Sequence, residues 1–406
     1  MKYSVLIFTI VVFALSSCGE KQAKITVANN SNVDLTAKSV VIERADIEMQ
    51  YGAMTEGAMV WLEDENGNQI PAQLDDIDGD MKWDELYAQI NLKAGDSKSF
   101  YLIFDEPSAF STVEYRTNIR FADINDASKE YVEAERLTSS TSEISQKHFQ
   151  FEGPGWENDV VGFRNYFDAR NGIDIFGKRT SEMILDKCGL ADGPSYHELQ
   201  PWGMDILKVG SSLGAGAIAL QTGSGLHRIG PKSKGTFTLV KEGPLRSIID
   251  LDFKGMMIDG DKIDIKHRIS IEAGKPFYNS EVYFDGTIDA QLVTGIVNLD
   301  SDSVYTKITK SISAFYTYDN QAYEGGKLGL AVIAPQNVLS VATAPEEGEG
   351  ITQTFYATLA SKNQPATFSF MAGWEKQNNV YATQKGFEKQ LVEQMKQLSA
   401  SIDVEI

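Results

Sequence analysis

Apolar and polar residues alternate along most of the chain, and turn-forming sequences separate the alternating segments. In the first hundred residues the pattern is seen in "ITVANNS", "SVVIER", "AMVWLE" and "SKSFYLIF", with "DENGNQ" and "LKAGDS" among the turns. Because successive side chains of a β-strand point to opposite faces, a period of two predicts strands with one buried face. We therefore predict a small antiparallel β-sandwich over residues 24–106.

A second and larger group of predicted strands lies further along. A polar passage rich in Ser and Thr comes first, and we interpret residues 107–147 as a connector. Strand-like segments then resume, among them "GTFTLV", "RSIIDLDF", "KIDIKHRISIEA" and "FYATLA". The chain shows no repeat of fixed period, which disfavours a propeller or a β-helix. The predicted fold class is all-β, with residues 148–406 forming a large β-sandwich domain.

A helical period appears only near the end of this large domain. Residues 384–399 place Phe387, Leu391, Met395 and Leu398 on one face, which predicts a C-terminal amphipathic helix. The sequence "IDVEI" follows it and predicts a last strand.

The phase of the predicted strands separates an apolar face from a polar one. In residues 263–271, isoleucines and His267 share one face, while Lys266 and Arg268 lie on the other. We interpret His267 as a hydrogen-bonded core residue. The polar face is either outer solvent surface or the floor of a polysaccharide cleft.

The first residues predict export. Lys2 precedes the apolar run "VLIFTIVVFAL", which is too short to span a bilayer as a helix. Leu15-Ser16-Ser17-Cys18 has the pattern of a bacterial lipobox, although an ordinary signal with a chance cysteine would look similar. We predict a signal peptide over residues 1–17, lipidation at Cys18, and a tether over residues 18–23. The protein would then be anchored in the bacterial cell envelope by lipid alone, in the periplasm or on the outer-membrane surface.

Cysteine usage and charge limit the partners. Once Cys18 is lipidated, Cys188 is the other of the two cysteines, so an intramolecular disulfide is excluded, and we interpret Cys188 as buried and unreactive. The net charge of −20 argues against nucleic-acid binding, which needs clustered Lys and Arg. It does not exclude an anionic substrate, because local basic clusters can outweigh net charge.

An acidic loop in the first domain has the spacing of a metal site. In "DDIDGDMKWDEL" the last four of the five aspartates fall at relative positions 1, 3, 5 and 9, and alternate carboxylates on a tight loop converge on one ion. The pattern resembles the calcium loops of integrin-type repeats, except that Met81 replaces a glycine. The predicted Ca²⁺ ligands are Asp76, Asp78, Asp80 and Asp84; the alternative is a solvated acidic hairpin.

The stretch "FEGPGWENDVVGFRNYF" concentrates aromatic and charged groups behind a Gly-Pro-Gly bend. Trp156 offers a flat apolar face for a sugar, Glu157 and Asp159 are possible acid/base groups, and Arg164 could bind a carboxylate. In the alternative interpretation, Glu157 and Asp159 pair with Arg164 to fix the loop, and Trp156 belongs to the core.

A loop with adjacent Tyr196 and His197 is the third candidate, with Trp202, Asp205 and Lys208 close behind. A lyase acting on uronates needs a cation to neutralise the carboxylate and a His or Tyr to remove the neighbouring proton. His197 could equally be a hydrogen-bonded structural residue.

Four separated motifs together resemble a known family. "WENDVVGFRNYF", "NGIDIFGKRT", "YHELQPWGMDILKVGSSLGAGAIAL" and "EGPLRSIIDLDF" are similar, in order, to a bacterial domain family of unknown function numbered 4861. The resemblance implies an exported protein of a glycan-degrading bacterium, with a large galactose-mutarotase-like β-supersandwich. The positions that match the family motifs are Trp156, Glu157, Asn158, Asp159, Arg164, Tyr166, Asp174, Lys178, Arg179, Tyr196, His197, Asp205, Lys208 and Arg246.

Together these features favour a carbohydrate-active enzyme, a lyase or a hydrolase, that acts on an acidic oligo- or polysaccharide. His197 and Tyr196 would transfer protons, and Glu157 or Asp159 would orient the histidine or act as acid. The alternatives are a non-catalytic glycan-binding lipoprotein, with Trp156, Trp202 and Tyr166 as a stacking platform, and a mutarotase-like or epimerase-like enzyme. The predicted charge-neutralising residues are Arg164, Lys178, Arg179 and Arg246.

Overall fold

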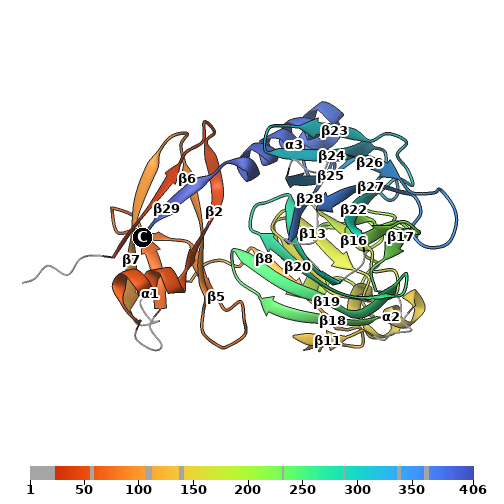
Figure 1. The fold of residues 1–406 in the computed structure, drawn as a ribbon, viewed down its shortest axis with the longest axis horizontal. Coiled ribbons are helices and arrows are strands. Elements are labelled where there is room, and N and C mark those ends of the chain that lie inside the picture. The colour runs from red at the N-terminus through yellow and green to blue at the C-terminus, as the bar shows by residue number, and fades with distance from the viewer. Residues whose placement is uncertain are drawn as a thin grey trace, which may run out of the picture.

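The structure is a computed structural model. It describes residues 23–54, 59–105, 112–136, 141–230, 233–286, 289–335, 340–360 and 365–406. The predicted signal peptide and Cys18 lie outside these ranges. Figure 1 shows two β units side by side, with helix α3 (Gln384–Ser399) running from the larger unit toward the smaller one. The all-β fold class predicted from the alternation is confirmed. Within the described ranges every strand pairing is antiparallel, and one isolated bridge, between Ile173 and Gly214, is parallel.

The small unit is a two-sheet sandwich, coloured red to orange in Figure 1 apart from its blue C-terminal strand. Its apolar strand faces enclose one core, to which Ile25, Val40 and Leu86 belong. Helix α1 (Arg44–Tyr51) adds Ile47 to that core. One sheet has the order β29 (Ile402–Glu405), β1 (Lys24–Asn29), β7 (Ser97–Asp105), β3 (Met59–Glu63) and β4 (Gln69–Ile70), and the other has β2 (Leu35–Glu43), β6 (Glu85–Leu92) and β5 (Ala72–Asp75).

Strand β29 departs from the expected domain division. The sequence placed it at the end of the large domain, but it pairs with β1 of the small sandwich, with Thr26 opposite Glu405. The expected connector also contributes to the large unit through β8 (Thr117–Arg120) and β11 (Glu133–Glu135). The other elements of that passage are β9 (Ala122–Asp123), β10 (Asp126–Glu130) and α2 (Ser142–His148).

The large unit packs a nine-stranded sheet against two five-stranded sheets. One core joins all three, as Ile249 and Ile265 of the first sheet, Phe163 of the second and Val293 of the third show. The nine-stranded sheet has the order β11, β18 (Lys234–Lys241), β19 (Arg246–Ile258), β20 (Asp261–Glu272), β21 (Phe277–Gly286), β28 (Ala366–Trp374), β25 (Leu328–Pro335), β24 (Ile312–Asp319) and β23 (Tyr305–Ile308).

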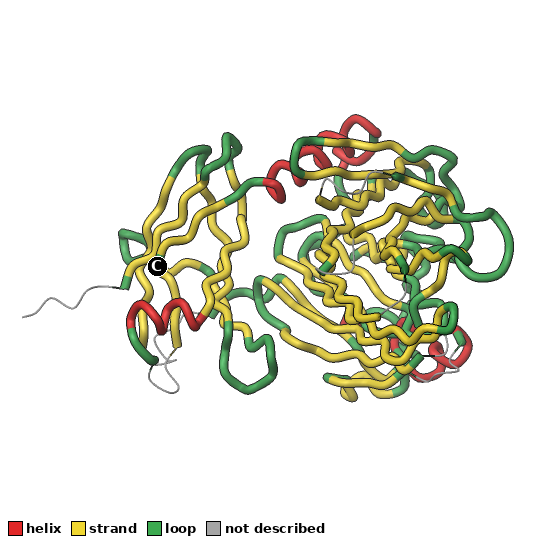
Figure 2. The backbone as a smooth tube through the Cα atoms, viewed as in Figure 1, coloured by secondary structure: helices red, strands yellow, loops and turns green. Residues whose placement is uncertain are grey.

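An isolated parallel bridge between Ile173 and Gly214 links the two smaller sheets. Figure 2 shows the backbone with its strands in yellow and the connecting loops in green. One of the smaller sheets has the order β15 (Gly203–Asp205), β14 (Ile173–Lys178), β13 (Val161–Asn165), β12 (Gly155–Asn158) and β8. The other has β17 (Gly225–Arg228), β16 (Ala215–Thr222), β22 (Gln291–Val297), β27 (Thr354–Ala360) and β26 (Val341–Thr343). Short 3₁₀ turns are η2 (Gln150–Glu152), η3 (Leu185–Lys187) and η4 (Asn379–Ala382).

The predicted strand faces of β20 are confirmed. Its isoleucines and His267 are buried, and the His267 Nε2 atom lies 2.9 Å from Ser280 Oγ. Burial lowers the pKa of His267 to about 3, so the ring is neutral. On the other face, Lys266 and Arg268 both bind Asp250, at 3.0 and 2.8 Å.

The predicted C-terminal helix is also confirmed, with the expected bounds. The Thr383 hydroxyl caps its N-terminus by accepting from the Gly386 N–H at 3.1 Å. Phe387, Leu391 and Met395 are buried, and they form one cluster with residues of β24 and β25. No helix in the described part of the chain is both long and apolar enough to cross a membrane.

Candidate functional site

Strand pairing explains how the Trp-Glu-Asn-Asp stretch folds. In the sheet of β12, β13 and β14, Trp156 lies opposite Phe163, and Arg164 lies opposite Asp174. Because side chains alternate, Trp156 and Phe163 face the core, whereas Arg164 and Asp174 face the opposite side. Asp205 of β15 joins that polar face, since it pairs with Phe176, two residues after Asp174.

Arg164 is the centre of a buried ionic network on this polar face. Its Nη2 atom donates to Asp174 at 2.8 Å and to Asp205 at 2.6 Å. Its guanidinium lies 5.0 Å from the ring centres of Tyr166 and Tyr196, and the Tyr166 hydroxyl donates to Asp174. Burial of a charge requires such compensation, so these groups fix one another.

Tyr196 and His197 connect this network to solvent. Arg164 Nη1 donates to the Tyr196 hydroxyl at 3.0 Å. His197 Nδ1 lies 3.3 Å from a carboxylate oxygen of Asp205, and the His197 side chain is 49% exposed whereas that of Asp205 is 3% exposed. When an exposed imidazole contacts a buried carboxylate, the carboxylate orients the ring through one nitrogen. The other nitrogen is then available to exchange a proton with a substrate.

A pocket of about 320 Å³ opens beside these two residues. Phe151, Glu152, Tyr196 and His197 line it, together with residues of α2 and of the segment 189–194. Phe151 and Glu152 have positive φ angles of 41° and 73°, which non-glycine residues adopt at a cost. The surrounding structure maintains this strain: Arg164 donates to the Phe151 carbonyl at 3.1 Å, and Glu152 binds Arg170.

The network shifts the pKa values of its members. Burial, with Asp205 adding its negative charge and Arg164 opposing both, raises the pKa of Asp174 to about 7. Burial also raises the pKa of Tyr196, against the opposing effect of Arg164. Burial alone would lower the pKa of Arg164, but Tyr166 and the aspartates raise it well above its ordinary range, so the guanidinium stays charged.

The structure corrects the roles expected for Glu157 and Lys178. Both side chains are fully buried and pair with each other at 2.6 Å. Glu157 also accepts from the backbone N–H groups of Ile184 and Leu185, at 2.7 and 2.8 Å. The Glu157–Lys178 pair thus anchors the segment at Ile184 and Leu185 to the sheet of β12, β13 and β14. Because both side chains are fully buried, neither can reach a substrate.

Trp156, Asn158 and Asp159 are likewise structural. Trp156 is fully buried and stacks on Phe163, so it offers no surface to a sugar. Asn158 is buried and donates to backbone carbonyls. Asp159 pairs with Arg116 at 2.6 Å instead of Arg164, and Asp205 takes the histidine-orienting position expected for Glu157 or Asp159.

Arg246 joins the two units instead of binding substrate. It lies in β19 of the large unit and pairs with Asp75 and Glu85 of the small sandwich, both at 2.5 Å. Gln73 supports the same junction, since its amide donates to the Arg246 carbonyl at 2.8 Å. One of the four cations expected to neutralise a uronate is thus committed to the domain contact.

The other predicted site residues divide by exposure. Arg164 and Tyr166 are buried, so their contact with a ligand would be indirect. Arg179 and Lys208 are exposed, and Trp202 is half-buried with its ring 6.2 Å from that of Phe176.

Two residues of the site were not predicted from the sequence. Glu152, directly before the Gly-Pro-Gly bend, could have been noticed as a charge beside a strained turn. Tyr323 lies in the loop between β24 and β25, its ring 6.1 Å from that of His197, and nothing in its local sequence indicates this.

The acidic loop brings three of its four aspartates together. Asp76, Asp78 and Asp84 offer carboxylate oxygens that all lie within 4.8 Å of one another. Asp80 is outside this group, and its carboxylate accepts from the Lys82 N–H at 2.8 Å. Met81 takes the positive φ of 70° that a glycine would supply, so its side chain does not prevent the turn.

Comparison with known proteins fits this two-unit architecture. The family model "Domain of unknown function (DUF4861)" matches residues 27–404. The chain belongs to this family. The DUF4861 protein is 23% identical to "Uncharacterized protein P7" of Formosa agariphila, over the full length of both chains.

Two solved structures from Enterococcus faecalis share the fold of this DUF4861 protein. One is described as an α-mannosidase, with 10% identity and a TM-score of 0.50, and the other as a protein in glycosyl hydrolase family 38, with 9% identity and a TM-score of 0.52. Each match covers 95% of this chain but only 46% and 48% of the larger protein. At such identities the likeness concerns the fold alone.

Proposed function

We propose that this DUF4861 protein is a carbohydrate-active enzyme that acts on an acidic glycan, with His197 as the proton-transferring group. The observation that carries the proposal is the half-exposed His197 ring held against buried Asp205, at the edge of a pocket whose backbone is strained. Strained backbone and buried charge pairs cost stability, and they concentrate where a site must be preorganised. The shared fold with the glycosyl hydrolase family 38 protein supports a glycan as the substrate.

The side chains favour proton abstraction over two-carboxylate hydrolysis. A hydrolase of the usual kind needs two carboxyl groups on either side of the glycosidic bond. Glu157, Asp159 and pocket-lining Glu152 are all held in ion pairs. This leaves exposed His197 and partly exposed Tyr196 as the acid/base groups at the pocket. A lyase uses such a pair, so we favour β-elimination on a uronate.

In this reaction His197 takes the proton from the carbon next to the uronate carboxylate. The electrons of that C–H bond form a C=C bond, and the neighbouring C–O glycosidic bond breaks. The Tyr196 hydroxyl gives its proton to the leaving oxygen, and the resulting phenolate is stabilised by the Arg164 N–H that already points at it. Transfer of the His197 proton to Tyr196 restores the enzyme. Exposed Arg179 and Lys208 are the candidates for neutralising the carboxylate.

The test is an assay of wild-type protein and His197→Ala on pectic, glucuronan and host uronate polymers. We expect new ultraviolet absorbance of the unsaturated product from wild type, and a loss of at least about 10²-fold in the variant. Since His197 is half-exposed, the melting temperature should change little; His227→Ala, at another partly exposed histidine, is the control. A large stability loss in His197→Ala would make the residue structural. Reducing ends without absorbance would indicate a hydrolase, and gel retardation without products a binding protein.

We also propose two properties outside the site. The carboxylates of Asp76, Asp78 and Asp84 form a hard-oxygen donor set suited to Ca²⁺, which would stabilise the loop between β5 and β6. The lipobox supports export and lipidation at Cys18, which would anchor the protein in the cell envelope.

A further inference from the structure

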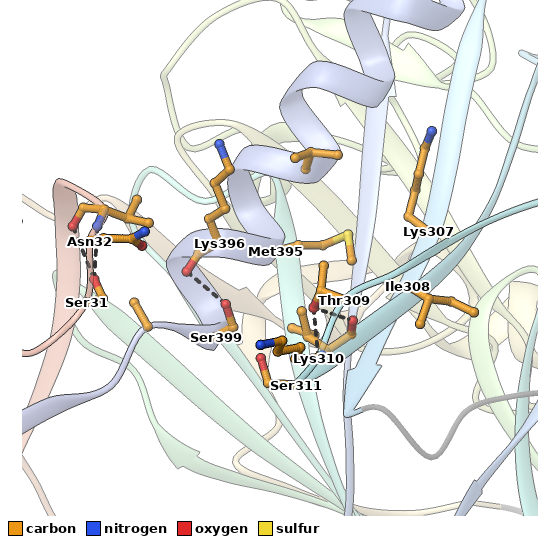
Figure 3. Close-up of a pocket in the computed structure, with 14 residues that line it drawn as sticks. Ser31, Asn32, Lys307, Ile308, Thr309, Lys310, Ser311, Met395, Lys396 and Ser399 are labelled. Carbon is orange, nitrogen blue, oxygen red and sulfur yellow. Dashed lines mark hydrogen bonds between the residues drawn. The ribbon is translucent and has the colours of Figure 1, made fainter.

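A second, larger pocket lies where the small sandwich, α3 and the hairpin of β23 and β24 meet (Figure 3). It has a volume of about 540 Å³, and its lining comes from three segments: 31–33, 307–312 and 392–400. Its floor is apolar, with Ile312 and Met395 buried and Val33 and Val392 partly buried. In Figure 3 the Met395 side chain points from α3 toward the hairpin.

The rim of this pocket is positively charged in a strongly acidic protein. Lys307, Lys310 and Lys396 line it, and no carboxylate does. Lys307 pairs with Glu388 at 3.0 Å, and Lys396 is 3.9 Å from Glu393. Lys310 has no ion pair within the part of the chain that the structure describes. Lys310 therefore carries the free positive charge, and Lys396 has a partner only at the longer distance.

The end of α3 does not cancel this charge. The last carbonyls of a helix carry partial negative charge, which would oppose an anion. Here Lys38 of the small sandwich donates to the carbonyls of Gln397 and Ala400, at 2.9 Å each. The helix end is thus neutralised from outside the pocket, and the rim lysines remain available.

The pocket continues onto the polar face of the nine-stranded sheet. An adjoining pocket of about 480 Å³ shares Ser311, Ile312 and Ser399 with it. Hydroxyl and amide groups line that second part, including Asn279 and Ser369, but so do Glu272 and Glu281. Arg246 also lines it, but its charge is already paired with Asp75 and Glu85. An anionic group would therefore be favoured at the lysine end and repelled at the other.

We propose that this groove is a second binding site, which holds an anionic saccharide unit by its carboxylate or sulfate group. Lys310 binds the anion, and Lys396 adds positive charge from another part of the rim. The rim hydroxyls bind sugar hydroxyls, and the apolar floor contacts the C–H face of the ring. The proposal rests on the acidic-glycan substrate class proposed above. This anchoring point is separate from the His197 site. The groove lies at the start of the eight-residue strand β24, and Tyr323, which contacts His197, follows the end of that strand. The length of the strand therefore separates the two sites by roughly 25 Å.

Affinity electrophoresis in gels with polygalacturonate, dextran sulfate or neutral dextran tests the proposal. At about 0.15 M salt, we expect one of the polyanions, but not neutral dextran, to retard the wild-type protein. Polygalacturonate would identify a carboxylate site and dextran sulfate a sulfate site. The double variant Lys310→Ala/Lys396→Ala should weaken the retardation about tenfold.

The matched control is Lys385→Ala/Lys389→Ala, which removes the same charge from exposed positions of α3 outside this pocket. It should be retarded like wild type. The proposed binding site would be overturned by equal weakening in both double variants, by unchanged retardation of Lys310→Ala/Lys396→Ala, or by no retardation of wild type. His197→Ala should still be retarded, and product formation by wild type tests the proposed reaction separately.

Discussion

At the scale of single residues, Arg164 has the largest predicted effect on stability. It is the only positive group within salt-bridge distance of both Asp174 and Asp205 among the residues described. Replacing it by Met leaves two buried carboxylates without their cation. We expect a loss of about 3–5 kcal/mol in the free energy of unfolding, measured by urea denaturation.

Arg179→Met provides the comparison for that variant. Arg179 is exposed, so its replacement should change the free energy of unfolding by no more than about 0.5 kcal/mol. Equal losses in the two variants would contradict the network as described.

Asp174 predicts a pH dependence of stability. Its pKa is about 7 in the folded protein, above the value of about 3.9 for an unfolded aspartate. Between these values the folded state binds more protons than the unfolded state, so this contribution is complete below about pH 4 and is lost as the pH rises through about 7. Asp174→Asn should remove it.

Unfolding measurements from pH 4 to 8 test this contribution. The stability of wild type relative to Asp174→Asn should fall as the pH rises across that range. A difference that stays constant with pH would contradict the raised pKa.

The residue roles show where sequence reasoning works and where it stops. Alternation separates Trp156 from Glu157, but it does not say which face meets the nine-stranded sheet and which is covered by the segment at Ile184 and Leu185. The Tyr196 and His197 pair was recognised as a candidate site. Its carboxylate partner was misassigned, because the pairing of β14 with β15 depends on contacts between distant segments.

At the scale of elements, the contact of α3 with the sheet depends on two glycines. A Cβ on Gly329 of β25 would lie 2.3 Å from the Phe387 ring, and one on Gly373 of β28 would lie 2.6 Å from the Tyr381 ring. Gly329→Ala should therefore displace Phe387 and lower the free energy of unfolding by about 1–3 kcal/mol. Gly223→Ala, where a Cβ meets nothing within 4 Å, should have little effect in the same denaturation experiment.

The acidic loop gives a prediction with an internal control. If Asp78 is a calcium ligand, added Ca²⁺ should raise the melting temperature of wild type by a few degrees, since a ligand that binds only the folded state stabilises it. Asp78→Asn should reduce that rise. Asp80→Asn, the same charge change outside the three-carboxylate group, should keep it. A rise of equal size in all three proteins would exclude this site.

At the scale of the whole molecule, the lipidation proposed at Cys18 predicts membrane attachment through one residue. Expressed in a bacterium with lipoprotein processing, wild type should partition into detergent and incorporate labelled fatty acid, and Cys18→Ser should do neither. Cys188→Ser should behave as wild type, because burial raises the pKa of Cys188 and removes its thiol from reaction. Detergent partitioning of Cys18→Ser would contradict the assignment.

The features of the overall architecture that depend on local sequence pattern were predictable. Strand period and the single amphipathic helix define two β units, and they do so without information on pairing. The return of β29 to β1 was not predicted, because a four-residue strand carries no information about which of two sheet edges it joins. The same holds for β8 and β11, whose sequences are short and polar.

The pairing of β1 with β29 also bears on the order in which the parts of the protein fold. These strands are more than 370 residues apart in the sequence. β1 therefore gains its second neighbouring strand only when almost all of the chain between Lys24 and Glu405 has been synthesised. Until then β1 presents open hydrogen-bonding groups along one edge, the condition that invites wrong pairing. Such long-range closure is slow. The small sandwich, although it is first in the sequence, is therefore expected to be the last unit to close. An incomplete chain would expose this edge to proteases and chaperones.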